Sequence, residues 1–231
     1  MPRLAIFDLD GTITRHDTLL RYVGGFLWRQ RPARLWRAPL CLLPLLQFCL
    51  AGADRGRLKG EIIRLTLGGL PRSELERWNR IFIARLLHGG VYTEALAAID
   101  AQRATGAHLV LLSASPDLYV PAIGTALGFN ATICTELRWH ADGRLHGALT
   151  SANRRGTEKV RCVRLLLQAQ APSYSCAYGN SRADLPHLRL VSEGVYVNGA
   201  ARDCSSDGNI RLVHWTTPAV APRTAPDHNR G

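Results

Sequence analysis

The chain has 231 residues, with 29 Lys and Arg against 18 Asp and Glu, and a formal net charge of +11. This length suits one domain with an insertion, or two small domains, and is sufficient for a hydrophobic core. The positive charge favours an anionic partner, whether a phosphate ester, an anionic lipid or a nucleic acid, but no nucleic-acid recognition motif is present, so we expect no specific nucleic-acid partner.

The first predicted element is a short apolar strand that ends in two carboxylates. Residues 4–7 form an apolar run typical of a strand covered on both faces, and Asp8 and Asp10 follow before Gly11 permits a sharp turn. Acidic groups at the carboxyl end of a parallel strand lie where open α/β sheets bind ligands. Two carboxylates this close repel unless a cation lies between them or one is protonated, and both states suit catalysis. An ordinary strand followed by a polar turn is the alternative.

A long helical insert is predicted after this strand. Helices are expected over residues 18–28, 55–67 and 73–87, and Gly89 and Gly90 end the insert. A helix over 93–103 then leads into a second apolar strand over 108–112, an order that favours a parallel crossover. The insert is therefore expected to form a cap over the carboxyl edge of the sheet.

Residues 38–52 form an apolar segment with two prolines and cationic side chains on both sides. The flanking cations are Arg29, Arg31, Arg34, Arg37, Arg55, Arg57 and Lys59. The segment is shorter than the roughly 20 residues that cross a bilayer. It suits a helix lying in the interface of an anionic membrane, and it equally suits a buried helical hairpin of the cap. The two interpretations are not exclusive.

Three further polar motifs follow along the chain. Ser113 and Ala114 come at the tip of the second strand, where they suit a cradle for phosphate oxygens or a plain helix N-cap. Lys159 lies near the start of a helix, where the helix dipole disfavours a cation, so it either meets an anionic partner or lies in solvent. Strands over 131–138, 145–149, 175–178 and 194–197 complete the core, and polar residues 179–184 follow the third of them.

The order of these motifs resembles the haloacid dehalogenase superfamily of phosphatases. Asp8-x-Asp10, Ser113, Lys159 and then Gly179-Asn180-Ser181-x-x-Asp184 carry this resemblance, which covers about residues 3–200. The helical insert is similar to that of the phosphoserine-phosphatase-like branch, subfamily IB. Residues 26–46, arginine-bearing and then rich in Leu and Pro, are similar to the membrane-associated phosphatidylglycerophosphatase C group.

The resemblance implies an α/β fold: a Rossmann-like parallel sheet with helices on both faces and an inserted helical cap. The catalytic core would comprise residues 1–15 and 90–202, and the cap residues 16–89. Residues 203–231 would be a C-terminal tail, disordered over about 216–231.

The resemblance also implies a phosphatase mechanism. Asp8 would attack phosphorus and form an aspartyl-phosphate, and Asp10 would protonate the leaving oxygen and then activate water. Oxygen atoms of Asp8, Asp10, Asn180 and Asp184 would bind Mg²⁺. Ser113, Ala114, Lys159 and Thr12 would bind or support the transferring phosphoryl group.

Asn180 departs from the family pattern, which usually has aspartate there. Its amide oxygen can still bind Mg²⁺ but brings no charge, so weaker metal binding is expected, with Asp184 as compensation. A degenerate, non-catalytic regulator is therefore an alternative hypothesis, although Asp8, the residue such a protein would be expected to lose, is present.

The expected substrate is a phosphate monoester, and the basic, Leu- and Pro-rich cap favours a membrane lipid phosphate such as phosphatidylglycerophosphate. The alternative is a soluble phosphoserine-like substrate. For that substrate, Asp17 matches in type the position where phosphoserine phosphatases read the substrate amine, and Arg64 suits a substrate carboxylate. Asp17 equally suits a helix N-cap, and Arg64 a solvated surface position.

The cysteine pattern and the start of the chain favour a cytoplasmic protein. The six cysteines form no C-x-x-C pair and no zinc spacing, so they are expected to be reduced. The first strand begins at once after residues 1–3, so no signal peptide is expected. Peripheral contact with an anionic membrane would place the protein at the cytoplasmic face of the inner membrane. None of these motifs predicts an oligomeric state.

Overall fold

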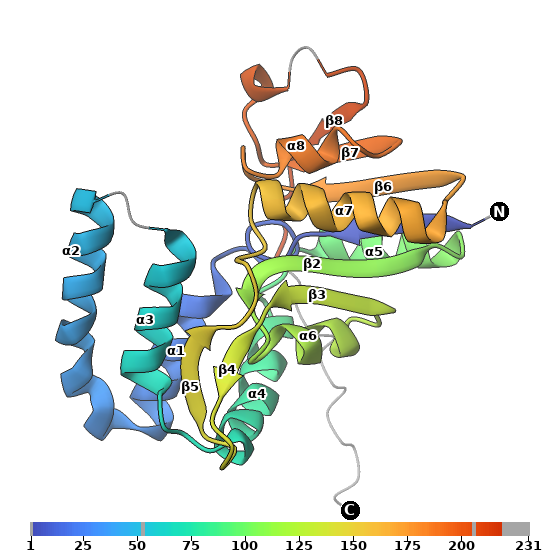
Figure 1. The fold of residues 1–231 in the computed structure, drawn as a ribbon. Coiled ribbons are helices and arrows are strands. Elements are labelled where there is room, and N and C mark those ends of the chain that lie inside the picture. Colours follow the sequence, from blue (N-terminus) through green and yellow to red (C-terminus); the bar gives the residue numbers. More distant parts are fainter. Residues whose placement is uncertain (1, 52–53, 205–206, 219–231) are drawn as a thin grey trace, which may run out of the picture.

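The computed structural model describes residues 2–51, 54–204 and 207–218. A parallel sheet forms its centre, with the strand order β3-β2-β1-β6-β7-β8 (Figure 1). The strands are β1 (Arg3–Phe7), β2 (His108–Pro116), β3 (Ala131–Thr135), β6 (Tyr174–Gly179), β7 (Glu193–Val197) and β8 (Ile210–Val213). The chain proceeds outward from β1 to β3 and then returns to β6 on the other side of β1. The predicted α/β class with a Rossmann-like parallel sheet is confirmed.

Both faces of the sheet are buried, which explains the uniformly apolar run in the first strand. Successive side chains of a strand point to opposite faces. Ala5 and Phe7 pack in the cluster that contains residues of α5 (Thr93–Ala104) and α6 (Val120–Ala126). Leu4 and Ile6 pack in a separate cluster with residues of α7 (Thr157–Gln170) and α8 (Leu185–Leu188). Because neither face meets water, no polar residue follows Arg3 within β1.

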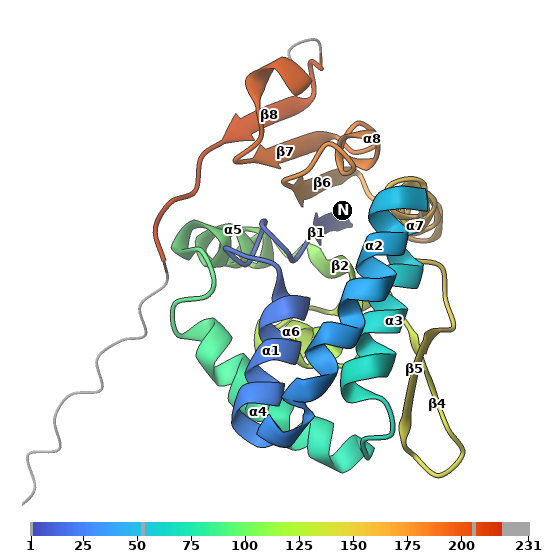
Figure 2. The same cartoon turned by 90° about the vertical axis from the view of Figure 1, so that its left-hand side faces the viewer.

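The predicted insert is helical and lies beyond the carboxyl ends of the strands (Figures 1 and 2). We call this part the cap; it comprises α1 (Thr18–Gln30), the 3-10 helix η1 (Pro32–Cys41), α2 (Leu42–Ala51), α3 (Arg55–Leu67) and α4 (Arg72–Leu87). An aromatic cluster joins it to the core: Tyr22 of α1 packs against Phe82 of α4 at 5.1 Å and against Tyr119 of the core at 4.6 Å, between ring centroids. The cap is therefore seated on the core through buried rings.

A two-stranded hairpin packs on the cap rather than joining the central sheet. It consists of β4 (Leu137–Trp139) and β5 (Leu145–Leu149). The backbone of Leu145 donates a hydrogen bond to Leu70 at 2.9 Å and accepts one from Gly69 at 2.8 Å. A Cβ at Gly147 would lie 2.8 Å from the backbone nitrogen of Arg64, so β5 approaches α3 closely. The predicted boundary at residue 90 assigns this hairpin to the core, but its contacts are with α3.

The assignment of a tail from residue 203 is wrong for the residues that the structure describes. After the short helix η2 (Ala201–Asp203), residues 210–213 form β8, which pairs with β7 at the sheet edge. The backbone N–H of Thr93 donates to the carbonyl of Thr217 at 2.9 Å, and Trp215 is buried. β8 has only four residues, one of them arginine, so its sequence pattern is weak. Residues 219–231 lie outside the described residues, and their predicted disorder stays a prediction.

Of the two interpretations of residues 38–52, burial as cap core does not hold for the leucines over 40–50, while Gly52 lies outside the described residues. Leu42, Leu43 and Leu46 of α2 are 57%, 63% and 55% exposed. We call the exposed leucines of this region the leucine patch: Leu40, Leu42, Leu43, Leu45, Leu46 and Leu50. None of the helices within the described ranges is both long enough and apolar enough to cross a bilayer.

The close packing of β5 on α3 can be tested by substituting one glycine in the hairpin. Gly147 and Gly143 both have positive φ, at 92° and 77°, but only Gly147 has atoms within 4 Å of an added Cβ. Gly143→Ala should lower the free energy of unfolding by about 1 kcal/mol through backbone strain alone. Gly147→Ala should lower it by about 1–3 kcal/mol more, because the methyl group meets the α3 backbone. Urea unfolding of both variants measures the difference, and equal losses would contradict the packing.

Candidate active site

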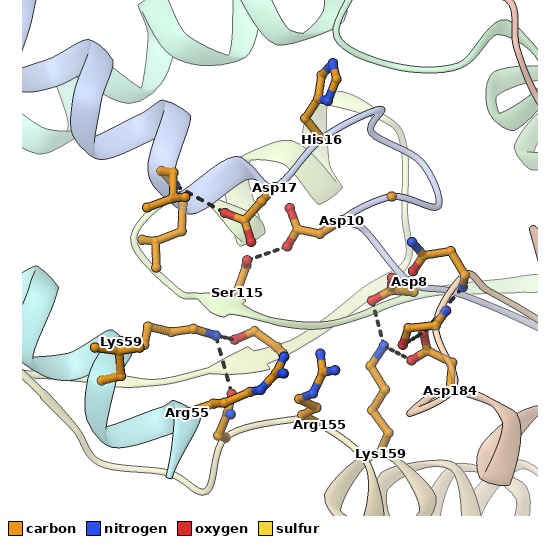
Figure 3. A pocket seen from close by; sticks show the side chains of 18 of the residues that line it. Asp8, Asp10, His16, Asp17, Arg55, Lys59, Ser115, Arg155, Lys159 and Asp184 are labelled. Carbon is orange, nitrogen blue, oxygen red and sulfur yellow. Dashed lines mark hydrogen bonds and ion pairs between the residues drawn. The ribbon is translucent and has the colours of Figure 1, made fainter. Parts of the chain in front are cut away.

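The candidate site lies where the winding direction of the sheet reverses. β1 and β6 are adjacent, yet the chain proceeds from them to opposite sides, and ligands bind in the crevice outside the carboxyl ends of such strands. Asp8 and Asp10 follow β1, and Asn180 follows β6. These residues line a cavity of about 660 Å³ whose other walls come from the loop before α7 and from the cap (Figure 3).

Lys159 joins the first and last motifs at the base of this cavity. Its ammonium group donates hydrogen bonds to Asp8 at 2.6 Å and to Asp184 at 2.7 Å, and all three side chains are buried. Burial alone would lower the pKa of Lys159, but the two carboxylates outweigh burial and raise it, so Lys159 is a cation. The expectation that a lysine at this helix start meets an anion is correct.

The two carboxylates bound by Lys159 differ in acidity. Burial, with repulsion from Asp184, raises the pKa of Asp8 to about 6 despite the opposing attraction of Lys159. Burial acts in the same direction on Asp184, but there the attraction of Lys159 wins and the pKa is lowered. Ser181 strengthens this effect, because its backbone N–H and its hydroxyl both donate to Asp184, at 3.0 and 2.6 Å. Asp184 is thus a fixed anion, and Asp8 responds to further cations in the cavity.

Asp10 is held by donors from the core and from the cap. Ser115 of β2 donates its hydroxyl to one carboxyl oxygen at 2.5 Å, and the backbone N–H of Thr18, the first residue of α1, donates to the other at 2.7 Å. The Thr18 hydroxyl in turn donates to buried Tyr119 at 3.0 Å. Burial raises the pKa of Asp10, while the hydrogen bonds from Ser115 and Thr18 lower it. A carboxyl group with a raised pKa, fixed in orientation, suits a proton donor.

The oxygen donors at this edge fit Mg²⁺ in their chemistry. Within the ranges that the structure describes, no three His, Cys, Asp or Glu side chains gather closely enough to hold a metal ion by themselves. Mg²⁺ is usually held by one or two carboxylates together with neutral oxygens, water and substrate phosphate. Asp8 and Asp184 supply the carboxylates. Asn180 packs against Gly11, where any Cβ would lie 2.0 Å from its amide nitrogen, so a larger residue at this position would displace the Asn180 side chain.

The second motif enters the site differently from the prediction. Ser113 is fully buried, and its hydroxyl accepts a hydrogen bond from the backbone N–H of Ser115 at 3.0 Å instead of lining the cavity. β2 continues to Pro116, so Ser113 is not the strand tip. Ala114 and Ser115 line the cavity in its place. Thr12 is likewise buried, and its hydroxyl donates to Asp8 at 3.1 Å, which positions that carboxylate.

The two residues predicted for a substrate headgroup are separated. Asp17 lines the cavity, but one of its carboxyl oxygens caps α1 by accepting the N–H of Leu20 at 3.2 Å. Arg64 is not brought to Asp8. It pairs with Glu61 at 2.7 Å and lines a different cavity, of about 350 Å³, between α3 and β5. The helical period explains this difference, because Arg64 lies on the face of α3 that meets the hairpin.

Several cavity residues were missed by sequence reasoning. Arg55, Lys59 and Ile62 share the α3 face toward Asp8, and their spacing of three to four residues is the signal that indicates one face. Ser115 follows Ser113 by two residues and has the same chemistry, but the pattern alone does not say which serine meets Asp10. No sequence pattern distinguishes Arg155, which lines the cavity, from its neighbour Arg154. Arg154 instead forms an ion pair with Glu158.

Comparison with known proteins shows relatives over most of the chain. The profile of haloacid dehalogenase-like hydrolases matches residues 5–189. The chain is 33% identical over 195 residues to protein CicA of Caulobacter vibrioides, which covers 84% of this chain and 86% of that protein.

Solved structures share the fold at lower identity. A protein of unknown function from Bordetella pertussis has a TM-score of 0.77 at 21% identity, covering 92% of this chain and 98% of its own. A haloacid dehalogenase family hydrolase from Salmonella enterica serovar Typhi has a TM-score of 0.66 at 14% identity, and the match covers 93% of this chain and 70% of that protein. A phosphoserine phosphatase, solved as an analogue of its phospho-aspartyl intermediate, has a TM-score of 0.62 at 15% identity, and the match covers 92% of this chain and 93% of that protein. With the family profile matched over most of its length, the chain belongs to the haloacid dehalogenase-like hydrolases.

Proposed function

We propose that the protein is a Mg²⁺-dependent phosphomonoester hydrolase that acts through an aspartyl-phosphate on Asp8. The supporting observation is that buried Lys159 bridges Asp8 and Asp184 in the same cavity as Asp10. This arrangement combines a nucleophile, a cation and an acid around one space. A Mg²⁺ ion held by Asp8, Asp184, Asn180 and the Asp10 carbonyl would supply positive charge against the phosphoryl oxygens.

The residues divide the reaction into two displacements. A carboxylate oxygen of Asp8 forms a bond to phosphorus as the bond to the leaving alcohol breaks, and Asp10 gives its proton to the departing oxygen. Asp10 then takes a proton from a water molecule, which attacks the aspartyl-phosphate and restores the Asp8 carboxylate. Lys159 offsets negative charge in both steps, where electrostatic stabilisation is the main contribution to catalysis. The presence of this whole set argues against the non-catalytic alternative.

Removal of the nucleophile tests this mechanism. Asp8→Asn should reduce Mg²⁺-dependent hydrolysis of p-nitrophenyl phosphate by roughly a thousandfold or more, because an amide cannot form the covalent intermediate. Circular dichroism should remain that of the native fold. Asp142→Asn, in the exposed turn of the hairpin, is the matched control and should keep full activity. Comparable turnover by Asp8→Asn would rule out the covalent route.

Replacement of the neutral ligand tests the metal site. Asn180→Asp adds a carboxylate oxygen, so the Mg²⁺ concentration for half-maximal activity should fall by roughly tenfold. Repulsion from Asp184 opposes part of this gain. A titration of activity against Mg²⁺ measures the effect. An active variant with an unchanged Mg²⁺ requirement would place Asn180 outside the coordination shell.

We infer that the substrate is a membrane lipid phosphate, of which phosphatidylglycerophosphate is one example. Apolar side chains line the cap side of the cavity, among them Phe48 of α2 and Leu58 of α3. The same α2 carries no charged residue and exposes most of the leucine patch. A helix that is apolar on all sides is usually buried in protein or lipid, and a large exposed apolar patch marks an interaction surface.

The flanking charge supports an anionic membrane as the partner of the leucine patch. Arg29, Arg31, Arg34 and Arg37 precede it, and Arg55 and Arg57 follow it in the chain. Each such cation near an anionic bilayer adds about 1 kcal/mol of attraction, which salt screens. The membrane face at which the protein acts, expected to be cytoplasmic, stays a prediction.

A soluble phosphoserine-like substrate is the second candidate. The shared fold with phosphoserine phosphatases favours it. However, the pair expected to read an amine and a carboxylate is not assembled, since Arg64 lies at another cavity and Asp17 caps α1. The lipid substrate therefore agrees better with the residues around the cavity.

Replacement of three exposed leucines tests the membrane partner. Each leucine gains about 1.5 kcal/mol or more when fully buried in acyl chains, part of which is offset by ordering of the segment. Leu42→Ser, Leu45→Ser and Leu46→Ser combined should release the protein from anionic vesicles in flotation at low salt. Activity on p-nitrophenyl phosphate should persist, because these side chains are exposed.

The control for this variant is Leu165→Ser. Leu165 is a half-exposed leucine of α7, outside the cap, so its replacement should leave vesicle binding intact. If the unmodified protein stays wholly with the soluble fraction, the leucine patch does not bind membrane and the soluble substrate becomes the better proposal.

A further inference from the structure

We propose that Arg55, Lys59 and Arg155 form a second anion-binding subsite in the cavity, which takes a second phosphate group of the substrate. This inference rests on the phosphomonoesterase activity proposed above and specifies a feature of its substrate. The substrate would carry one phosphate as the reacting monoester and another, at a distance along the molecule, as a diester or a second monoester.

The three cations come from separate parts of the chain and line one space. Arg55 and Lys59 belong to the first turns of α3, and Arg155 lies in the loop before α7. In the view of Figure 3, the Arg155 side chain stands between those of Arg55 and Lys159. Arg55 and Arg155 also both line a second cavity, of about 570 Å³, so the two arginines border a shared space.

Within the described ranges, none of the three is joined to a carboxylate by an ion pair within 4 Å. Lys59 instead donates to the carbonyl of Ala114 and to the side chain of Asn153 at 3.4 Å. Its neighbourhood is costly for a cation: burial lowers its pKa, and Arg155 adds to this, while Asp10 and Asp17 oppose it. Arginine and lysine held together without a directly paired carboxylate indicate that an anionic ligand completes the set.

The reacting phosphoryl group does not account for these charges. Lys159 already lies beside Asp8 and serves that group at the carboxyl end of β1. Arg55 and Lys59 belong to the cap and face the same cavity from the other wall. Two planar guanidinium forks and an ammonium group offer donors in several directions, which suits the tetrahedral oxygens of a phosphate better than a flat carboxylate.

The test compares two short-chain lipids below their micelle concentration, so that no membrane surface contributes. Dihexanoyl phosphatidate carries only the terminal monoester, and dihexanoyl phosphatidylglycerophosphate carries a diester phosphate as well. The kcat/KM of the wild-type protein should be about tenfold or more higher on dihexanoyl phosphatidylglycerophosphate than on dihexanoyl phosphatidate. Arg55→Gln and Arg155→Gln should each lower this ratio by about tenfold, chiefly through KM, since hydrogen bonds to a bound anion are lost.

Arg57→Gln is the matched control. It removes the same charge from the same helix, but Arg57 lines the cavity between α3 and β5, so the ratio should stay at the wild-type value. Arg55 is exposed, so its replacement keeps the test decisive even if Arg155→Gln folds poorly. A third substrate, the two-phosphate compound without acyl chains, separates recognition of the second phosphate from recognition of the lipid chains. If Arg55→Gln and Arg155→Gln also lower its turnover, the arginines recognise the phosphate itself.

The outcomes separate this inference from the proposed function. If wild-type protein hydrolyses neither lipid nor p-nitrophenyl phosphate, the proposed function fails. If it hydrolyses them but shows no preference for the second phosphate, or if both arginine variants keep the wild-type ratio, the subsite is overturned and the phosphatase stands. The subsite is also overturned if Arg57→Gln lowers the ratio of the two kcat/KM values as much as Arg55→Gln and Arg155→Gln do. Long-range charge would then explain the preference.

Discussion

The ion triad of Lys159 with Asp8 and Asp184 is the interaction on which the site depends. Burial of three charged groups costs several kcal/mol for each ion unless every charge is paired and hydrogen-bonded. Here one ammonium group serves two carboxylates, at 2.6 and 2.7 Å, and leaves one net negative charge. In the proposed mechanism, that remaining charge would attract Mg²⁺, whose positive charge would in turn favour binding of a phosphate dianion. The triad exists only because β1, β6 and the start of α7 meet at one sheet edge.

The cap is coupled to this chemistry by two polar contacts. The backbone N–H of Thr18, the first residue of α1, orients Asp10, the general acid of the proposed mechanism. Lys59 of α3 donates to the carbonyl of Ala114, in the part of β2 that lines the cavity beside Asp10. The seating of the cap on the core therefore both lines the cavity and orients Asp10, the proton donor of the proposed mechanism.

The sequence predicts the parts of the molecule that local patterns determine. The apolar run of β1 reflects burial on both faces, and Asp8, Asp10 and Lys159 come from motifs whose order implies the fold. Tertiary contacts decide the rest. Ser115, not Ser113, meets Asp10 because β2 extends further than its pattern indicates. β8 escapes prediction because an edge strand of four residues gains its stability from pairing with β7. The exposure of the leucine patch is likewise a property of packing, since composition alone suits burial equally well.

The helix α3 shows how the insert separates stability from specificity. One of its faces carries Gly56 and Gly60 and packs against β5, where a Cβ on Gly56 would lie 3.1 Å from Leu149 and one on Gly60 3.4 Å from the carbonyl oxygen of Gly147. The other carries Arg55 and Lys59 into the cavity, beside Phe48 of α2. The strand ends supply chemistry that suits any phosphomonoester, whereas cations and apolar groups that could select among substrates come from the cap and from the loop before α7. Because β5 packs on the first face of α3, it positions the helix that carries these cations, and in the proposed subsite the separation between them and Asp8 would select the substrates that match it.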